Sequence, residues 1–217
     1  MATKRLKTSQ RRWRRRKQAR PGEIAAAALE LFIERGFAVT RLDDVARRAG
    51  VTKGTVYLYF KNKDALFRAA VRTFVLPELE RAEEQVAEFK GDTRQLVREL
   101  VHRWWDIVGE SQLCGIPKLV IAEARNFPDL ARYFVNRVVR RARRLFASVI
   151  ERGIGRGEFR SCDVNHAARV LTAPLVFAAI WERSLRSYDR DPYDVRRYLD
   201  VHIETFLSGL SKRTASR

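Results

Sequence analysis

The sequence predicts an all-α fold of about nine helices, and three observations support this. Apolar residues recur at three- and four-residue spacing through most of the chain, which is the period of an amphipathic helix. No segment shows the sustained alternation of apolar and polar residues that marks a half-buried strand. Capping residues, glycine or proline stand between the periodic segments, and the chain has no internal repeat. Its 217 residues, 46% of them hydrophobic, suffice for a sizeable core.

The first two helices follow from their end signals. Pro21 suits the first turn of a helix that continues to about Arg35. Thr40, with Asp43 three residues later, predicts a capping box at the start of the second helix. Gly50 ends this helix, where a left-handed backbone is needed.

The third helix is short, and its composition indicates a binding surface. Thr52 is its natural N-cap, and it opens with Lys53, Gly54 and Thr55 before it ends near Tyr59. A cation, a glycine and hydroxyl groups are poor core material, but they suit a surface that approaches phosphates and base edges. The second and third helices therefore predict a helix-turn-helix.

The remaining helices fill the rest of the chain. Asn62 caps a fourth helix, which continues past Pro77 with a kink. Later helices are predicted from Thr93, over 119–124, from Pro128, from Asp163 and through Tyr198 to Leu210, with turns at Gly91-Asp92, Gly115 to Pro117, Gly153 to Gly157 and Asp189 to Pro192. The segment from Ala173 to Trp181 is apolar nearly all round, which predicts burial on both sides.

Positive charge is concentrated near the N-terminus. Residues 1–75 hold 19 Lys/Arg against 6 Asp/Glu, whereas residues 76–217 hold 25 against 20. This asymmetry favours a polyanionic partner for the helix-turn-helix. Residues 1–19 are predicted to be a disordered basic arm that adds phosphate affinity or enters the minor groove, and a solvated tail is the alternative. The arginine run from Arg137 to Arg144 is interpreted as a solvated helix face, with a second nucleic-acid patch as the alternative.

Several classes of protein are disfavoured. No run of 18 apolar residues predicts a membrane span, and the two cysteines are expected to be reduced thiols in a cytosolic protein. Cys162 to His166 contains potential metal ligands, but a helix cap with an incidental histidine explains them better. No phosphate-binding glycine motif or catalytic triad is present. We therefore expect no catalytic site, metal or cofactor.

From about Ala19 to Val75 the chain resembles the DNA-binding domain of the tetracycline-repressor (TetR) family of transcriptional regulators. The matching residues are Ile24, Ala28, Leu31, Phe32, Gly36, Thr40, Val45, Ala46, Ala49, Gly50, Val51, Lys53, Gly54, Thr55, Val56, Tyr57, Tyr59, Phe60, Lys63, Leu66 and Phe67. The resemblance implies a homeodomain-like helix-turn-helix domain over 20–66 and a ligand-binding and dimerisation domain over 67–211, with a tail over 212–217.

The resemblance also implies the residues that contact double-stranded operator DNA. These are Thr40, Arg41, Thr52, Lys53, Gly54, Thr55, Tyr57, Tyr59 and Lys63. Gly54 would let the backbones approach, and Lys63 with its helix N-terminus would form an anion site. Leu58 stands where many relatives carry a second tyrosine, which leaves the base preference open.

In the C-terminal domain the resemblance implies a ligand cavity among the fourth to eighth helices. The aromatic candidates for its lining are Phe74, Trp104, Trp105, Phe127, Phe134, Phe177 and Trp181. Any one aromatic at helical spacing is more often a core residue, but the group as a whole predicts an apolar cavity. The acidic candidates near it, Glu123 and Asp106, are interpreted as partners of neighbouring arginines rather than of a cationic ligand.

The chain is thus predicted to be a homodimeric, cytoplasmic and nucleoid-associated bacterial regulator, not an enzyme. The simplest form is a repressor that a small apolar or amphipathic molecule releases from a palindromic operator. The helix from Val164 and the last helix would form the dimer seam. The ligand would push the helix that begins at Lys63 and move the DNA-binding heads apart. A DNA-organising protein of the same fold and a helical enzyme localised by its basic arm stay open as alternatives.

Overall fold

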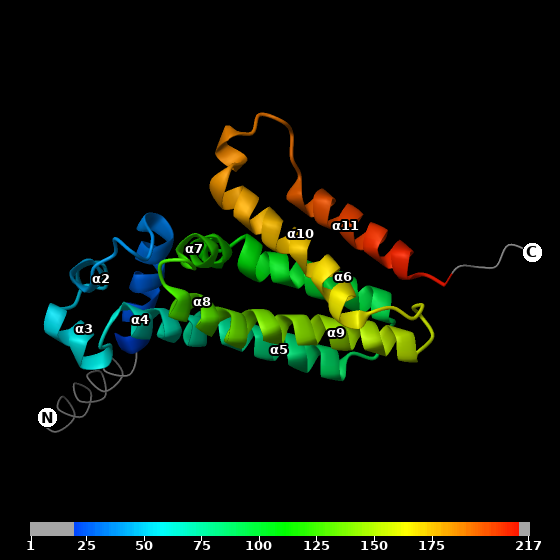
Figure 1. Cartoon of the computed structure of the whole chain (residues 1–217), viewed down its shortest axis with the longest axis horizontal. Helices are drawn as coiled ribbons and strands as arrows, with labels where there is room; N and C mark the ends of the chain where they lie inside the picture. Colours follow the sequence, from blue (N-terminus) through cyan, green and yellow to red (C-terminus); the bar gives the residue numbers. More distant parts are fainter. Residues whose placement is uncertain (1–19, 213–217) are drawn as a thin grey trace, which may run out of the picture.

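A computed structural model describes residues 20–212, and over this range the chain is built from helices without a strand. The predicted basic arm and residues 213–217 lie outside the described residues. An N-terminal helix over 20–35 packs with α2 (Leu42–Arg48) and α3 (Lys53–Tyr59) into a small head. Figure 1 shows this head at one end of an elongated helical body.

The body is a bundle of helices of different lengths. These are α4 (Lys63–Ala70), α5 (Leu76–Glu88), α6 (Thr93–Trp104), α7 (Gly115–Glu123), α8 (Pro128–Phe134), α9 (Arg140–Gly155), α10 (Val164–Ser184) and α11 (Val195–Leu210). Turns of π-helix join α4 to α5 (Val71–Val75), extend α6 (Trp105–Gly109) and join α8 to α9 (Val135–Val139), and short 3-10 turns precede α7 (Gln112–Cys114) and follow α10 (Arg186–Tyr188). When each run through a π turn counts as one helix, the described residues hold nine helices, as predicted.

Three of the predicted N-caps are confirmed. The Thr52 hydroxyl oxygen accepts a hydrogen bond from the Thr55 N–H, and the Asn62 side chain accepts one from the Ala65 N–H. Asp163 caps α10 in the same way. Gly50 has a φ of 64°, in the left-handed region that its position after α2 requires.

The capping box predicted at Thr40 is wrong. The N-cap of α2 is Arg41, which makes no capping hydrogen bond with its side chain. Thr40 is only 2% exposed, and its hydroxyl donates to the carbonyl oxygens of Gly36 at 2.7 Å and Leu31 at 3.3 Å. The hydroxyl therefore ties the loop to the N-terminal helix, a role that local spacing does not reveal.

Two predicted glycine turns are helical instead. Helix α9 continues to Gly155, and a Cβ at Gly153 would lie 2.2 Å from the Phe159 ring. Likewise Gly115 begins α7, and a Cβ there would lie 2.4 Å from Ile33 of the N-terminal helix. Both glycines allow close packing between segments, and Gly115 brings α7 against the head.

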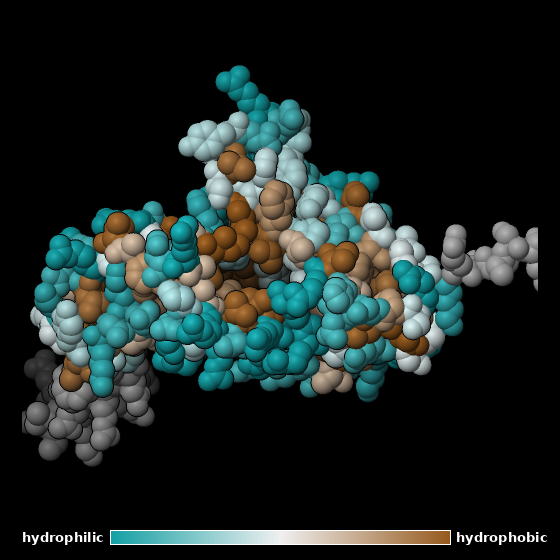
Figure 2. Space-filling model, viewed as in Figure 1, coloured by the Kyte–Doolittle hydropathy of each residue, from teal (hydrophilic) through white to brown (hydrophobic). Residues whose placement is uncertain are grey.

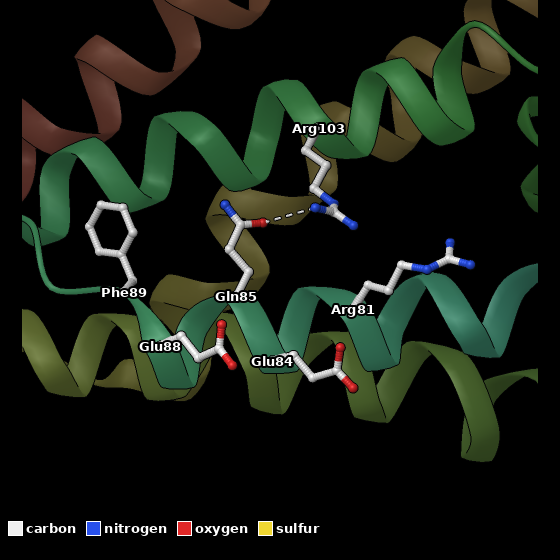
Figure 3. A pocket seen from close by; sticks show the side chains of 6 residues that line it. All are labelled: Arg81, Glu84, Gln85, Glu88, Phe89 and Arg103. Carbon is white, nitrogen blue, oxygen red and sulfur yellow. Dashed lines mark hydrogen bonds between the residues drawn. The ribbon is translucent and has the colours of Figure 1, made fainter.

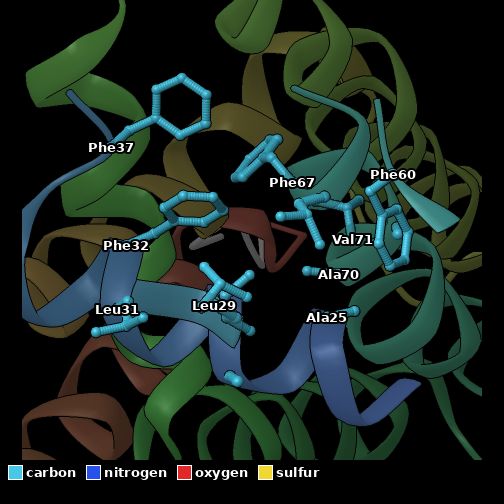
Figure 4. Packing of buried hydrophobic residues seen from close by; sticks show 14 of the residues in the cluster. Ala25, Leu29, Leu31, Phe32, Phe37, Phe60, Phe67, Ala70 and Val71 are labelled. Carbon is cyan, nitrogen blue, oxygen red and sulfur yellow. The ribbon is translucent and has the colours of Figure 1, made fainter. Parts of the chain in front are cut away.

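The buried apolar residues form two separate cores. The junction core joins the N-terminal helix, α2, α3 and α4 to α7 and α8, and Figure 4 shows residues at its centre, among them Phe32, Phe37 and Phe67. The body core joins α6, α9, α10 and α11. Each of the three π turns lies where the chain passes from one core toward the other. Such turns are frequent at functional sites.

Helix α10 is not buried on both sides, contrary to prediction. Val170 is 60% exposed and Phe177 is 57% exposed, and α11 exposes Val201 on its own surface. By length and composition α10 could also cross a membrane. It packs instead along α7, α9 and α11, as the core helix of a helical bundle does. Within residues 20–212 no segment covers this apolar surface.

Candidate nucleic-acid interface and its junction with the body

Helix α3 is anchored by one side chain and presents the others outward. Val56 is fully buried, whereas Tyr57 is 49% and Leu58 is 72% exposed. Gly54 is exposed, and a Cβ there would meet no atom closer than 3.9 Å. Since no internal packing requires a glycine at this position, the open space favours close approach by an external backbone.

Lys53 has a partner that the sequence analysis missed. The Lys53 ammonium lies 2.9 Å from the Asp43 carboxylate on α2 and 5.9 Å from the centre of the Tyr57 ring. The hydrogen bond to Asp43 raises the pKa of Lys53 above its usual value. The cation is therefore held at the surface of the head, where any incoming anion would have to compete with Asp43 for it.

The other predicted DNA contacts have different surroundings. Arg41 and Thr52 are exposed at the starts of α2 and α3, and the Thr52 and Thr55 hydroxyls lie 2.9 Å apart. Tyr59 is half-buried against the junction core. Arg41 and Thr52 are thus accessible at the surface, whereas Tyr59 is only partly so. Thr40, by contrast, has its hydroxyl committed inside the domain.

Lys63 is also turned inward. Its ammonium donates to the carbonyl oxygens of Phe37 and Ala38, both at 2.7 Å, and lies 4.9 Å from the centre of the Phe37 ring. Partial burial lowers the pKa of Lys63, and the Glu123 carboxylate opposes this shift. In this conformation Lys63 does not offer its charge to a phosphate. It holds the loop that precedes α2.

The same loop is held from the body by Glu123 at the end of α7. Its carboxylate accepts a hydrogen bond from the Ala38 N–H at 3.0 Å, and the residue is 8% exposed. Phe127 follows, with its ring 4.8 Å from the Phe37 ring in an edge-to-face arrangement. We call Glu123, Phe127 and Lys63, together with the loop they hold, the latch. A cleft of about 440 Å³ between the N-terminal helix and α7 borders it.

The two acidic candidates, Asp106 and Glu123, have different kinds of partner. Asp106 pairs with Arg196 of α11 at 2.7 Å, as its interpretation predicted. Among the described residues Glu123 pairs with a backbone amide and not with an arginine, so that interpretation is wrong there. Sequence patterns carry no signal for this contact because the two residues are 85 positions apart.

The predicted aromatic lining is not gathered around one cavity. Phe134 belongs to the junction core, with Phe74 and Phe127 at its edge. Trp105 is buried in the body core, and Trp104 lies at its edge. Phe177 and Trp181 pair on α10 with ring centres 5.9 Å apart. The candidates thus occupy both cores and an exposed helix face.

Two concave regions of the body differ in character. An open groove of about 460 Å³ between α5 and α6 is lined by Arg81, Glu84, Gln85, Glu88, Phe89 and Arg103 (Figure 3). Its mostly charged lining is unlike an apolar ligand site. Figure 2 shows a second, apolar hollow between α7, α10 and the α8–α9 helix. Within residues 20–212 no cluster of His, Cys, Asp and Glu could hold a metal ion.

Comparisons with known proteins agree with this division into head and body. Residues 24–70 match the family model for bacterial regulatory proteins of the tetR family, and residues 88–191 match a tetracyclin repressor-like C-terminal domain. The fatty acid metabolism regulator protein of Bacillus subtilis is 26% identical and covers 91% of this chain and 100% of its own length. The transcriptional repressor KstR2 of Rhodococcus jostii is also 26% identical, over 88% of this chain and 93% of its own length.

Solved structures show the same fold. A putative TetR-family regulator from Mesorhizobium loti has a TM-score of 0.72 at 25% identity and covers 91% of this chain and 99% of its own. The regulator FadR of Bacillus subtilis, solved in complex with stearoyl-CoA, also has a TM-score of 0.72, at 22% identity, over 87% and 98% of the two chains.

Proposed function

The chain belongs to the TetR family of transcriptional regulators, and from this premise we propose that it is a repressor which a small apolar or amphipathic molecule releases from a palindromic operator. It is a DNA-binding regulator and not an enzyme. The observation that carries the DNA-binding part is the outer face of α3, where Lys53, Gly54 and Tyr57 are presented together while Val56 anchors the helix.

A dimer is part of the proposal because one head reads only one half-site. The apolar strip formed by Val170 and Phe177 on α10, with Val201 on α11, is exposed in the single chain. Exposed apolar surface of this kind marks an interaction site. Two copies that pair their α10 and α11 helices would form a four-helix seam and carry two heads to successive major grooves.

The effector site is proposed at the gap between the two cores. Three π turns border this gap, and the apolar hollow of Figure 2 lies over the helices that connect the cores. A ligand there would contact α7 and the α8–α9 helix, which both reach the junction core. Among the predicted aromatics, Phe74 and Trp105 lie within π turns, and Trp104 and Phe134 each directly precede one. These four residues are proposed to respond to the ligand.

The latch connects the helices beside the proposed effector site with the head. The sequence analysis expected a ligand to push the helix that begins at Lys63. The structure supports a second connection, since Glu123 of α7 and Lys63 of α4 hold the same loop before α2. A ligand that favours a different position of α7 would therefore shift the head. Its effect is limited by the difference between its affinities for the two arrangements.

The test is binding of the full-length protein to the DNA upstream of its own gene, measured by fluorescence anisotropy with excess random competitor. Lys53→Ala should weaken specific binding about tenfold or more, because it removes a contact to DNA. Arg98→Ala on the exposed face of α6 is the matched control for lost charge and should bind normally. Equal affinity for random duplex would instead support the DNA-organising alternative, and unchanged binding by Lys53→Ala would remove α3 from the interface.

A further inference from the structure

The arginine run of α9 contains side chains that have no hydrogen-bonded or ion-paired partner among the described residues. Arg141 is the exception, because its guanidinium makes two 2.6 Å hydrogen bonds to Glu83 of α5. Within residues 20–212, Arg140, Arg143 and Arg144 make no hydrogen bond or ion pair, and neither does Arg169 of α10. Helical spacing places Arg141 on the side of α9 that faces α5 and Arg143 on the side that faces α10.

Arg143 is the most unusual of these side chains. It is half-buried, and the charges of Arg169 and Arg140 lie close enough to act on it. Burial, followed by repulsion from these two cations, lowers the pKa of Arg143 below its usual value. A partly desolvated cation between two like charges is unfavourable in isolation. A bound anion would offset the cost of both the desolvation and the repulsion.

Apolar strips lead to this cluster along both helices. On the α8–α9 helix, Val135, Val139 and Arg143 follow one another at four-residue spacing, and Val135 is 38% exposed. On α10 the corresponding strip consists of Ile180, Val176, Ala173 and Arg169. The helical rise gives a length of about 12 Å from Val135 to Arg143 and about 16 Å from Ile180 to Arg169. Helices α9 and α10 pack against each other and run antiparallel in Figure 1, and the charge of Arg169 acts on Arg143. Helical spacing therefore directs both strips toward this pair of arginines.

The space-filling view agrees with this arrangement. Figure 2 shows the apolar hollow between α10 and the α8–α9 helix, with hydrophilic side chains of α9 along its rim. We propose that the effector is an amphipathic anion, whose apolar chain occupies this hollow and whose charged head binds Arg143 and Arg169. This inference rests on the proposed function, and it adds the chemical class of the effector and the residues that select it. Arg140 and Arg144 add positive charge beside the head.

The experiment measures ligand binding by calorimetry with three probes that share one acyl chain. Stearoyl-CoA carries phosphates, stearate carries a carboxylate and methyl stearate is uncharged. One variant carries both Arg143→Gln and Arg169→Gln, and the control variant carries Arg98→Gln on α6. The double variant should bind stearoyl-CoA, stearate or both on the order of tenfold or more weakly, since each charge-assisted hydrogen bond it loses is strong. The probe that loses most identifies the head group.

Methyl stearate should bind equally to all three proteins, and the control should bind every probe as the wild type does. Unchanged affinity of the double variant for both anionic probes would overturn the inference. An equal loss of affinity for methyl stearate would also overturn it, because it would indicate a structural role for the arginines. A double variant that is monomeric in sedimentation would overturn it too, because it would place the arginines in the subunit seam. Weaker binding to random DNA with unchanged probe affinity would assign the cluster to a second nucleic-acid patch.

Failure of the inference and failure of the proposed function are separable. If methyl stearate releases the operator as well as stearoyl-CoA does, the anion site is wrong and the ligand-released repressor stands. If the wild type shows no preference for any palindrome in its upstream DNA, the proposed function fails, whatever the arginines bind.

Discussion

The contact between Glu123 and the Ala38 N–H gives a direct test of the connection between body and head. The carboxylate is 8% exposed and lies 3.0 Å from the amide nitrogen. A hydrogen bond to a charged acceptor contributes about 1.5–3 kcal/mol, against about 0.5–1.5 kcal/mol for a neutral one. Glu123→Ala should therefore lower the free energy of unfolding by about 1–3 kcal/mol, and Glu123→Gln by less.

Hydrogen exchange locates the effect. In Glu123→Ala the amides of residues 36–40 should exchange about tenfold faster, because a local opening is now opposed by roughly 1.5 kcal/mol less. The melting temperature should fall by about 2–12 °C, since each kcal/mol lowers it by about 2–4 °C in a chain of this size. Glu88→Ala, an exposed carboxylate on α5, is the matched control and should change neither quantity. Unaltered exchange at 36–40 in Glu123→Ala would refute the latch.

Three further predictions concern other parts of the molecule. Asp43→Asn should free the Lys53 ammonium and raise affinity for random DNA several-fold at low salt, as measured by anisotropy; reduced affinity would mean that Asp43 positions Lys53 instead. Phe177→Glu should convert the dimer to monomer in sedimentation, since it places a charge in the proposed seam; an intact dimer would move the seam elsewhere. Arg141 lowers the pKa of Glu83 below its usual 4.5, so the stability from this pair is present above that pH and lost as the pH falls through the folded-state pKa. Thermal melts of wild type and Arg141→Gln should therefore converge in acid, and a constant difference down to pH 3 would contradict the pairing.

Local signals in the sequence predicted much of the backbone. Thr52, Asn62 and Asp163 cap the helices they were expected to cap, because a cap depends on residues two or three positions away. Thr40 has an equally good local signal, but its hydroxyl bonds to the carbonyls of Leu31 and Gly36. These hydrogen bonds formed in place of the predicted capping box, and a rule based on local spacing cannot predict them.

Side-chain destinations were less predictable than helices. Lys63 could extend toward DNA or fold inward, and only the packed position of Phe37 and Ala38 decides between these. The positions of the aromatic residues were equally hard to predict from the sequence. Periodicity shows which face of a helix is apolar, but it cannot show that Phe134 enters one core while Trp105 enters the other.

The position of α7 explains how a division into two cores can serve regulation. Just before this helix, the Cys114 thiol bonds to the Ala179 carbonyl of α10, and Lys118 donates to the Arg183 carbonyl of the same helix. At its other end Glu123 holds the head. A helix of nine residues fixed at both ends acts as a rigid strut between them. A single continuous core would resist movement of this strut, whereas separate cores allow α7 and α10 to shift together. A ligand in the proposed effector site would contact both helices, so its binding and the position of the head would depend on the same displacement.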